Sequence, residues 1–595
     1  MRRLVIWLLL AVGITWPVMS SPQQQLLGSE AVDVWNHAWG YWYVFEALSS
    51  GRLPLSTQLV GAPHGGTLYF IDTLGALWAL PITALLGPAV AYNVVMLSRV
   101  ALAGLCGQLL ARELIGPGAH TWIAGLASVS LPFLLCELSN GISEVCAVHW
   151  LLLTFLATAR CQRLGRGRDW ALLGLTVGLT AATTFYYGLI GAIMAGVLLL
   201  LGGAMRDSWR SGLWWKASLS AAVAAAIITP VWTLFRRSLH APGGLIRRDE
   251  IQRESLLAHN AVDPMIFFAP GRFQSVDLMA EFGEAFLHTG YLRWSVLLLA
   301  VVGCRERPAL RPWALAAVLS LLLGMGSYLW WGGGWLTLAG ERVPLPFLVL
   351  LKVLPEVSIT HPLRLSVGGQ LLAGVLAAGG LAALMERCRS GVLATAAGAL
   401  IVAEGLLGSA VRWPLPTADA LIPDLYSSLQ ADQRAVLELP VEVGTTMRTS
   451  RYFWHQTLHT RPIPYTPDVR LASSRDPLVL GALTGGGIAG IGAEQPQSPD
   501  GLTMSRLRVN YGAVILNLDL AEVAGLTGAY EAALTPRLGE PETVGTRRLW
   551  RLPPATESDR AAVLRAELPP EEPEPPSTTQ PGLRRRLHDQ PPGRP

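Results

Sequence analysis

A succession of long apolar segments, separated by short loops rich in arginine, constrains the fold of this chain most. A helix needs roughly 20 apolar residues to cross a bilayer core of about 30 Å. Charged residues make up only 15% of the 595 positions, whereas an average soluble domain carries about 25%. Soluble globular, disordered and nucleic-acid-binding classes therefore fit poorly. Eleven candidate spans cover residues 4–20, 89–111, 119–137, 146–160, 170–185, 187–204, 213–235, 291–303, 312–330, 364–385 and 391–410.

The positions of the basic residues predict how these spans are oriented. Cytoplasmic loops carry an excess of Lys and Arg, so we expect the basic loops at 160–168, 206–216, 305–311 and 387–389 to be cytoplasmic. All four satisfy the rule if the N-terminus is cytoplasmic and the apolar run 69–86 lies along the outer surface as a juxtamembrane helix. The loop 236–290 then lies outside although it contains Arg236, Arg237, Arg247 and Arg248, because long loops obey the rule weakly.

Two further segments have more than one interpretation. The N-terminal run follows Arg2 and Arg3, like a signal peptide, but it ends in a poor cleavage site, so we interpret it as an uncleaved span. The run 345–354 lies between Pro344 and Pro355 and is too short to span, so it is expected to be re-entrant or interfacial at the outer face.

The sequence predicts three parts of the chain. Residues 1–412 form a mainly α, polytopic transmembrane bundle of an inner membrane, with external loops 21–88 and 236–290. Residues 413–553 form a small extracytoplasmic α/β domain, in which 435–443 and 508–520 alternate like strands and 521–534 reads as a helix. Residues 554–595 are rich in proline and mixed charge, and are expected to be disordered.

The first external loop holds the most informative candidates for chemistry. A helix beginning after Asp33 places Asp33, His37 and Tyr41 on one face. It places Trp35, Trp39 and Trp42 on another face, which we expect to contact lipid. Asp33 is either a helix N-cap or a catalytic carboxylate, and the local sequence favours neither. His37 taken alone is more often a structural, hydrogen-bonded residue.

Other candidates lie in segments that return to the same outer face. Glu144 occupies the short loop between the third and fourth spans; a solvated loop carboxylate is the simpler reading, but ionisable groups at this depth are functional candidates. Asp72, in the juxtamembrane run, is a weaker third acid. Basic groups at this face either snorkel to the interface or bind a lipid phosphate; they are Arg272, Lys352, His361 and Arg364.

Common nucleotide, redox and hydrolase motifs are missing from the sequence. It contains no P-loop, CxxC, HExxH or GxSxG pattern. Cys136 and Cys146 flank one short loop, and they either form a disulfide or remain two buried thiols.

The arrangement resembles the GT-C superfamily of membrane glycosyltransferases. Its parts are a first span, the early acid Asp33, a juxtamembrane run, the second acid Glu144 and a C-terminal external domain. The segments 438–443, 451–465 and 510–520 look like the soluble tail of uncharacterised bacterial members. The matching positions are Tyr452, Gln456, His459, Arg461, Pro462, Tyr511 and Gly512.

The resemblance implies a transfer reaction at the outer face. The donor would be a polyprenyl-phosphate-linked sugar, the acceptor an extracytoplasmic glycan, lipid or protein, and Asp33 the general base, with basic residues meeting the leaving phosphate. Two departures stand out: the second acid is Glu144 where better-known members often have Asp, and the first loop has no acidic pair such as DxD. The second departure weakens the case for a divalent cation. The competing hypothesis is a non-enzymatic transporter or envelope assembly factor.

Overall fold

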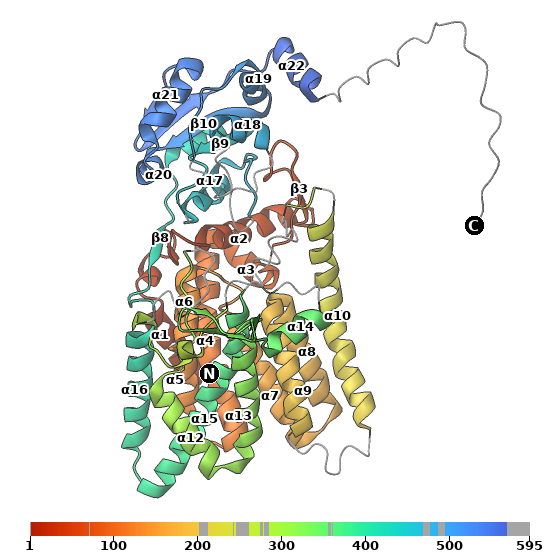
Figure 1. The fold of residues 1–595 in the computed structure, drawn as a ribbon, viewed down its shortest axis with the longest axis vertical. Helices are drawn as coiled ribbons and strands as arrows, with labels where there is room; N and C mark the ends of the chain where they lie inside the picture. The colour runs from red at the N-terminus through yellow and green to blue at the C-terminus, as the bar shows by residue number, and fades with distance from the viewer. Residues whose placement is uncertain are drawn as a thin grey trace, which may run out of the picture.

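The computed structural model describes residues 2–567 apart from 71, 202–211, 242, 246–260, 274–277, 279–284, 355–358, 360, 445, 468–475 and 486–493. A helical bundle makes up one end of the molecule, and a four-stranded sheet with its helices makes up the other (Figure 1). We call the end of the bundle nearest the sheet its sheet end. The bundle helices are α1 (Arg2–Ile14), α4 (Pro88–Ile115), α5 (Thr121–Val129), α6 (Pro132–Asn140), α7 (Val148–Leu164), α8 (Gly167–Thr183), α9 (Phe185–Leu201), α10 (Leu213–His240), α12 (Trp294–Glu306), α13 (Arg311–Leu323), α15 (Val367–Cys388) and α16 (Val392–Gly408).

Each of the eleven predicted spans coincides with a helix or a pair of helices. By length and composition, four stretches in the described part of the chain are long and apolar enough to cross a membrane. They are Pro88–Ile115, Thr121–Asn140, Leu213–His240 and Pro362–Cys388. The total of about eleven crossings therefore stays a prediction. The predicted span 119–137 is two helices, because Pro132 starts a new helix at a position where its missing N–H costs nothing.

Two short helices replace the ambiguous apolar runs. The run 69–86 forms α3 (Thr73–Leu86), and the run 345–354 forms α14 (Pro346–Val353). Together with α2 (Val34–Ser49), α3 lies between the bundle and the sheet (Figure 1). The helix predicted to begin after Asp33 is confirmed, since α2 starts at the next residue.

The sheet has the strand order β11–β12–β10–β9. Strands β9 (Ala435–Leu439) and β10 (Tyr511–Asn517) pair in parallel and confirm the two predicted strands. Every residue of both strands is buried, as expected for strands covered on both faces. The antiparallel strands are β11 (Glu542–Val544) and β12 (Arg547–Arg551). The accompanying helices are α17 (Arg451–His459), α18 (Pro477–Leu483), α19 (Gly501–Asn510), α20 (Leu518–Val523) and α21 (Thr527–Leu538).

The segment after the sheet differs from the expectation of disorder. Residues Glu557–Glu567 form α22, which packs against α19. A reciprocal capping box starts this helix: the Thr556 N–H donates to Asp559 Oδ2 at 2.9 Å, and the Asp559 N–H donates to Thr556 Oγ1 at 3.1 Å. The Ser505 hydroxyl also donates to Asp559 at 2.9 Å. The proline-rich composition masked this local signal; residues 568–595 of the expected tail lie outside the described residues.

The tryptophan face of α2 contacts protein, which corrects the expected lipid-facing side. Trp35, Trp39 and Trp42 are 3%, 0% and 8% exposed. The Trp39 indole N–H donates to Gln456 Oε1 at 2.8 Å, and its ring lies 5.5 Å from that of Phe453 on α17. Helical periodicity shows which residues share a face, but it does not show what covers that face.

Candidate functional site

Helix α2 directs its titratable face toward the bundle. His37 and Tyr41 are buried on this face, and Asp33 is half-buried at its start. Gly40 permits the close approach of the neighbouring loop, because a Cβ at this position would lie 2.0 Å from the ring of Phe70. The face predicted from the four-residue spacing is therefore confirmed.

Asp72 is the fully buried anchor of this region. It begins α3 and accepts hydrogen bonds from Arg99 Nη2 at 2.7 Å, from the Tyr41 hydroxyl at 2.6 Å and from the Ser143 hydroxyl. Burial disfavours its charged form, but Arg99 and these hydrogen bonds outweigh burial and hold the pKa of Asp72 below its usual value. With 0% exposure and both oxygens engaged, this predicted substrate ligand has a structural position.

Ser143 connects this anchor to His37 and Glu144, in the loop between α6 and α7. While its hydroxyl donates to Asp72, its oxygen lies 3.1 Å from His37 Nδ1. The same ring nitrogen lies 3.3 Å from Glu144 Oε2, which has no hydrogen bond to any other described residue. The structure thus brings His37 and Glu144 together, although they are about a hundred positions apart in sequence.

Burial makes the His37–Glu144 pair titrate in an unusual range. Burial, followed by the charge of Asp72, raises the pKa of Glu144 to about 7, and the Arg364 charge opposes this shift. Burial lowers the pKa of His37, against the charges of Asp33 and Asp72. A buried carboxyl group whose pKa is raised toward neutrality, in contact with a histidine, is a candidate for proton-transfer chemistry.

Asp33 lies at the start of α2, one helical turn before His37. Its side chain makes no capping hydrogen bond to the backbone of α2, so the geometry does not support the simple N-cap interpretation. The Asn36 amide donates to Asp33 Oδ1 at 3.2 Å. The negative charge of Asp33 also acts to raise the pKa of His37, which lies one helical turn further along α2.

A second group of ionisable residues surrounds Glu137. Arg364 Nε lies 3.7 Å and His288 Nδ1 3.8 Å from Glu137 Oε1. Neither Glu137 oxygen has a hydrogen-bond partner among the residues described, although this side chain is 0% exposed. The rings of His288 and His361 lie 5.1 Å apart, and the Arg364 guanidinium packs 5.2 Å over the ring of Tyr186.

This second group also belongs to the sheet end. Arg364 lies on the short helix η7 (Pro362–Ser366) at the start of α15, and its charge acts on both Glu144 and His37. Burial and the neighbouring cations His361 and Arg364 lower the pKa of His288 well below its usual value. The predicted residues His361 and Arg364 are therefore close to the predicted acids.

Two predicted cations lie apart from this cluster. Arg272 is exposed on η4 (Gly271–Phe273), whose first residue packs against Ala410 after α16. Lys352 is exposed at the end of α14. Among the described contacts, neither reaches Glu144, Glu137 or His37.

Sequence reasoning missed Arg99, Glu137, Ser143 and His288. Arg99 and Glu137 each interrupt a long apolar run, and an ionisable residue in such a run is a functional candidate by default. That signal was sufficient to find both. Ser143 and His288 carry no comparable local signal, because their importance comes from contacts distant in sequence.

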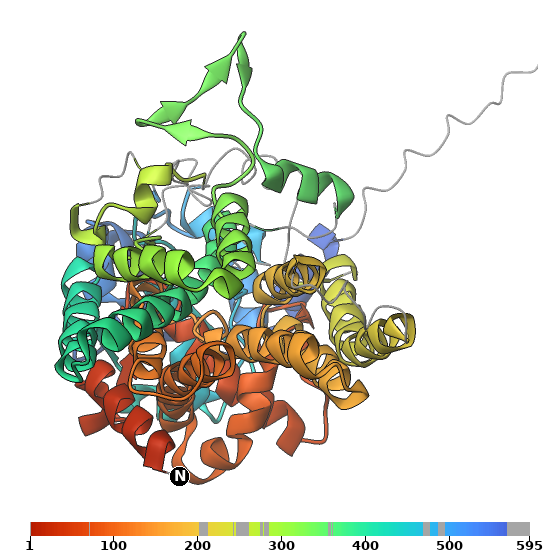
Figure 2. The ribbon, with the colours of Figure 1, turned by 90° about the horizontal axis from the view of Figure 1, so that it is seen from below.

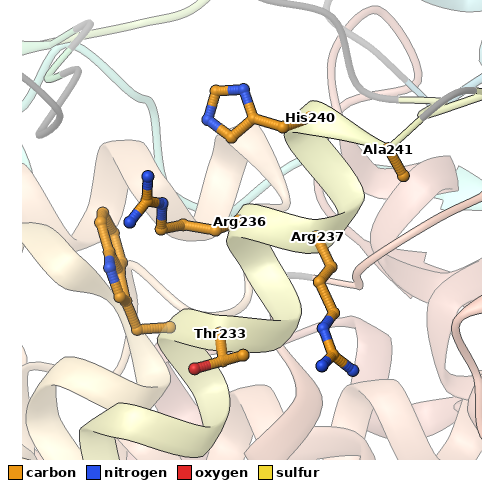
Figure 3. Close-up of a pocket in the computed structure, with 6 residues that line it drawn as sticks. Thr233, Arg236, Arg237, His240 and Ala241 are labelled. Carbon is orange, nitrogen blue, oxygen red and sulfur yellow. The ribbon is translucent and has the colours of Figure 1, made fainter.

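A separate basic hollow of about 550 Å³ opens at the end of α10 (Figure 3). Trp232, Arg236, Arg237 and His240 line it, together with Thr233 and Ala241. The ring of Trp232 lies 5.0 Å from the ring of Phe185 on α9. The next residue of α9, Tyr186, is the one that contacts the Arg364 guanidinium. The sequence predicted a loop from residue 236 onward, whereas the structure places Arg236 and Arg237 in the last turns of α10.

The described residues hold no group of three His, Cys, Asp or Glu side chains that could bind a metal ion. We therefore assign no metal ligands. Cys136 and Cys146 are both free and buried, which matches the two-thiol alternative.

No family model and no curated protein matches the chain. Solved structures do resemble it. The apo oligosaccharyltransferase of Archaeoglobus fulgidus aligns with a TM-score of 0.50 and 13% identity, over 89% of this chain and 72% of that one. The arabinofuranosyltransferase AftD from Mycobacteria aligns with a TM-score of 0.50 and 13% identity, over 93% of this chain and 42% of that one. ArnT from Cupriavidus metallidurans, bound to undecaprenyl phosphate, aligns with a TM-score of 0.45 and 13% identity, over 92% of this chain and 97% of that one.

These neighbours are glycosyltransferases of the GT-C class. The two alignments at a TM-score of 0.50 show that this chain has the GT-C fold, which confirms the resemblance at the level of architecture. With its apolar helices and membrane-protein neighbours, the chain is an integral membrane protein. It spans less than half the length of AftD.

Proposed function

We propose that this protein is a membrane glycosyltransferase that moves a sugar from a polyprenyl-phosphate carrier to an acceptor, with Asp33 as the general base. The observation that carries the proposal is the grouping of Asp33, the His37–Glu144 pair and Arg364 at the sheet end of a GT-C fold. Such a transfer needs a base that removes the acceptor proton and a cation that meets the charge of the leaving phosphate. The carboxylate of Asp33, beside the His37–Glu144 pair, would provide the first, and the buried Arg364 would provide the second.

The proposed reaction has three parts: deprotonation of the acceptor, formation of the new glycosidic bond and departure of the lipid phosphate. Asp33 takes the proton of the acceptor hydroxyl, whose oxygen bonds to the anomeric carbon of the sugar. The bond from that carbon to the phosphate oxygen breaks, and the lipid phosphate leaves with the electron pair. A positioned general base contributes typically about 10²–10⁴-fold. The leaving group needs no proton if cations meet its charge.

Arg364 and His361 are the residues that we propose to receive the phosphate. The Arg364 guanidinium is 7% exposed and is held over Tyr186, so its orientation is fixed before the donor arrives. Its contact with Glu137 at 3.7 Å is longer than a hydrogen bond. Phosphate oxygens match a guanidinium in bidentate geometry and would compete well for it.

The buried Asp72 supports the site without touching substrate. Its hydrogen bonds with Ser143 and Tyr41 fix the loop that bears Glu144 and the face of α2 that bears His37. We propose that Glu144 acts through His37, as a second proton-holding group one helical turn from the base.

The proposal includes an orientation. The N-terminus is cytoplasmic, and the sheet end and the four-stranded sheet lie on the extracytoplasmic side of an inner membrane. This follows from the four basic loops, all of which must lie at the opposite end. The acceptor, an extracytoplasmic glycan, lipid or protein, would approach Asp33 from the side of the sheet.

The test is a purified protein in lipid nanodiscs given a panel of synthetic polyprenyl-phosphate sugars. Release of polyprenyl phosphate reports turnover whichever acceptor is used. Asp33→Asn should fold but lose about 10²-fold or more of the rate. Asp424→Asn, an exposed acid on η8 (Asp424–Leu429), is the matched control and should retain the rate. Full turnover by Asp33→Asn would remove Asp33 as the base.

A further inference from the structure

A projecting hairpin rich in tryptophan follows α13. Residues 328–344, the tryptophan hairpin, contain the paired strands β4 (Trp330–Trp331) with β5 (Gly334–Trp335), and β6 (Thr337–Leu338) with β7 (Glu341–Arg342). Figure 2 shows this hairpin extending sideways beyond the helices of the bundle, with α14 directly after it. It is an ordered element: Leu329 N–H donates to Val343 O at 2.9 Å and Leu336 N–H to Leu329 O at 3.0 Å.

The surface of this hairpin is apolar where a water-exposed loop would be polar. Trp331, Leu336 and Leu338 are 54%, 44% and 75% exposed. The exposed apolar surface continues on α14, where Val349 and Val353 are 62% and 69% exposed and Phe347 is buried. An exposed apolar patch of this kind marks a protein or membrane contact.

Its polar groups are arranged as at a membrane interface. Residues 328–344 contain one basic and one acidic side chain, Arg342 and Glu341. The Arg342 guanidinium packs 4.7 Å over the Trp335 ring and 5.9 Å from that of Tyr328. Trp and Tyr concentrate at headgroup level, where the ring has an apolar body and a polar edge. A cation held among them suits anionic headgroups.

A hydrogen bond also holds the hairpin against a neighbouring loop. The Gly332 N–H donates to Asp263 Oδ2 at 2.7 Å, which ties the turn between β4 and β5 to the loop before η3 (Pro264–Phe267). After α14, the chain continues toward η7 and Arg364. The exposed apolar element therefore precedes the proposed phosphate-binding arginine in the sequence.

We propose that the tryptophan hairpin and α14 insert into the interface of the outer leaflet, with Trp331, Leu336 and Leu338 at the boundary of the acyl chains and Arg342 among the headgroups. The partner is a lipid surface. The proposal rests on the orientation given above, and it is independent of sugar transfer.

The experiment measures depth by fluorescence quenching. Leu338→Cys and Val349→Cys are made in a Cys304→Ser, Cys388→Ser background, since the other four cysteines are buried. Each is labelled with a small fluorophore and reconstituted into phosphatidylcholine–phosphatidylglycerol vesicles. Quenchers are spin-labelled lipids bearing the nitroxide near the headgroup, and aqueous iodide.

Two exposed leucines calibrate the measurement. Leu298→Cys lies 66% exposed along α12, where we expect acyl chains, and Leu421→Cys lies 63% exposed beside the sheet, where we expect water. The shallow lipid quencher should reduce fluorescence at Leu338 and Val349 about twofold or more, as expected for groups at the interface. Iodide should act strongly at Leu421 only.

Two results would overturn the proposal. One is iodide quenching at Leu338 equal to that at Leu421, with no effect of the lipid quencher, which would place the hairpin in water. The other is protection from both quenchers together with cross-linking of Leu338→Cys to a second copy, which would make the hairpin a protein contact. Neither readout depends on turnover, so a failure of the proposed enzyme activity leaves this test intact.

Discussion

The Nδ1 nitrogen of His37 lies 3.3 Å from Oε2 of Glu144, and both side chains are more than nine-tenths buried. The pair joins α2 to the loop between α6 and α7, and Ser143 links it to the buried Asp72. Arg99 and the hydrogen bonds hold the pKa of Asp72 below its usual value, whereas burial raises the pKa of Glu144 to about 7.

The first prediction concerns the pH dependence of sugar transfer. The pKa of Glu144 is raised to about 7, so its carboxylate is charged above that pH and neutral below it. When it is neutral, it no longer favours a proton on His37. We expect kcat/KM for the donor to fall about tenfold per pH unit below pH 7. A Glu144→Gln variant should lose this acid limb and have a lower, flatter profile.

The second prediction concerns the stability of the same variant. The folded pKa of Glu144 lies above its ordinary 4.5, so folding takes up a proton between these values and the free energy of unfolding falls as pH rises toward 7. Above pH 7 the full cost of the buried charge is present. Glu144→Gln should then be more stable than the parent by about 3 kcal/mol, but equal to it near pH 4. Thermal unfolding in detergent at the two pH values measures the difference; a variant less stable at high pH would contradict it.

A third prediction tests Asp72 as an anchor. Removing one partner of a buried ion pair leaves the other uncompensated and costs about 3–5 kcal/mol. Asp72→Asn should therefore lower stability strongly, by leaving Arg99 unpaired. Tyr41→Phe, which removes one hydrogen bond to the same carboxylate, should cost about 1.5–3 kcal/mol. Denaturant unfolding of the two variants measures how much each lowers the free energy of unfolding. A larger loss of stability for Tyr41→Phe than for Asp72→Asn would contradict the central position of Asp72.

Local patterns in the sequence predict much of this architecture. Apolar runs predict the helices of the bundle, the four-residue spacing predicts the face of α2 with Asp33, His37 and Tyr41, and alternation predicts β9 and β10. Such patterns act within a few residues, which is the range over which helices and strands form. For the same reason the Thr556–Asp559 capping box could have predicted α22.

Contacts distant in sequence explain what local patterns do not predict. The burial of Trp39 depends on Gln456, more than four hundred residues away. The break between α5 and α6 leaves carbonyl groups that the fully buried Arg293 satisfies, donating to Ala127 O at 2.7 Å and to Ser130 O at 3.2 Å. Likewise, the pairing of Glu137 with Arg364 and His288 requires three separate segments to meet.

The last prediction separates Arg364 from the other basic residues at this face. If Arg364 receives the leaving phosphate, Arg364→Lys should weaken product inhibition by polyprenyl phosphate and lower kcat/KM about tenfold or more, because an ammonium cannot replace a bidentate guanidinium. Arg272→Lys is the matched comparison. It lies exposed on η4 beside α16, so its effect on donor kinetics should be small. Equal losses in the two variants would show that general positive charge, rather than the buried guanidinium over Tyr186, binds the donor.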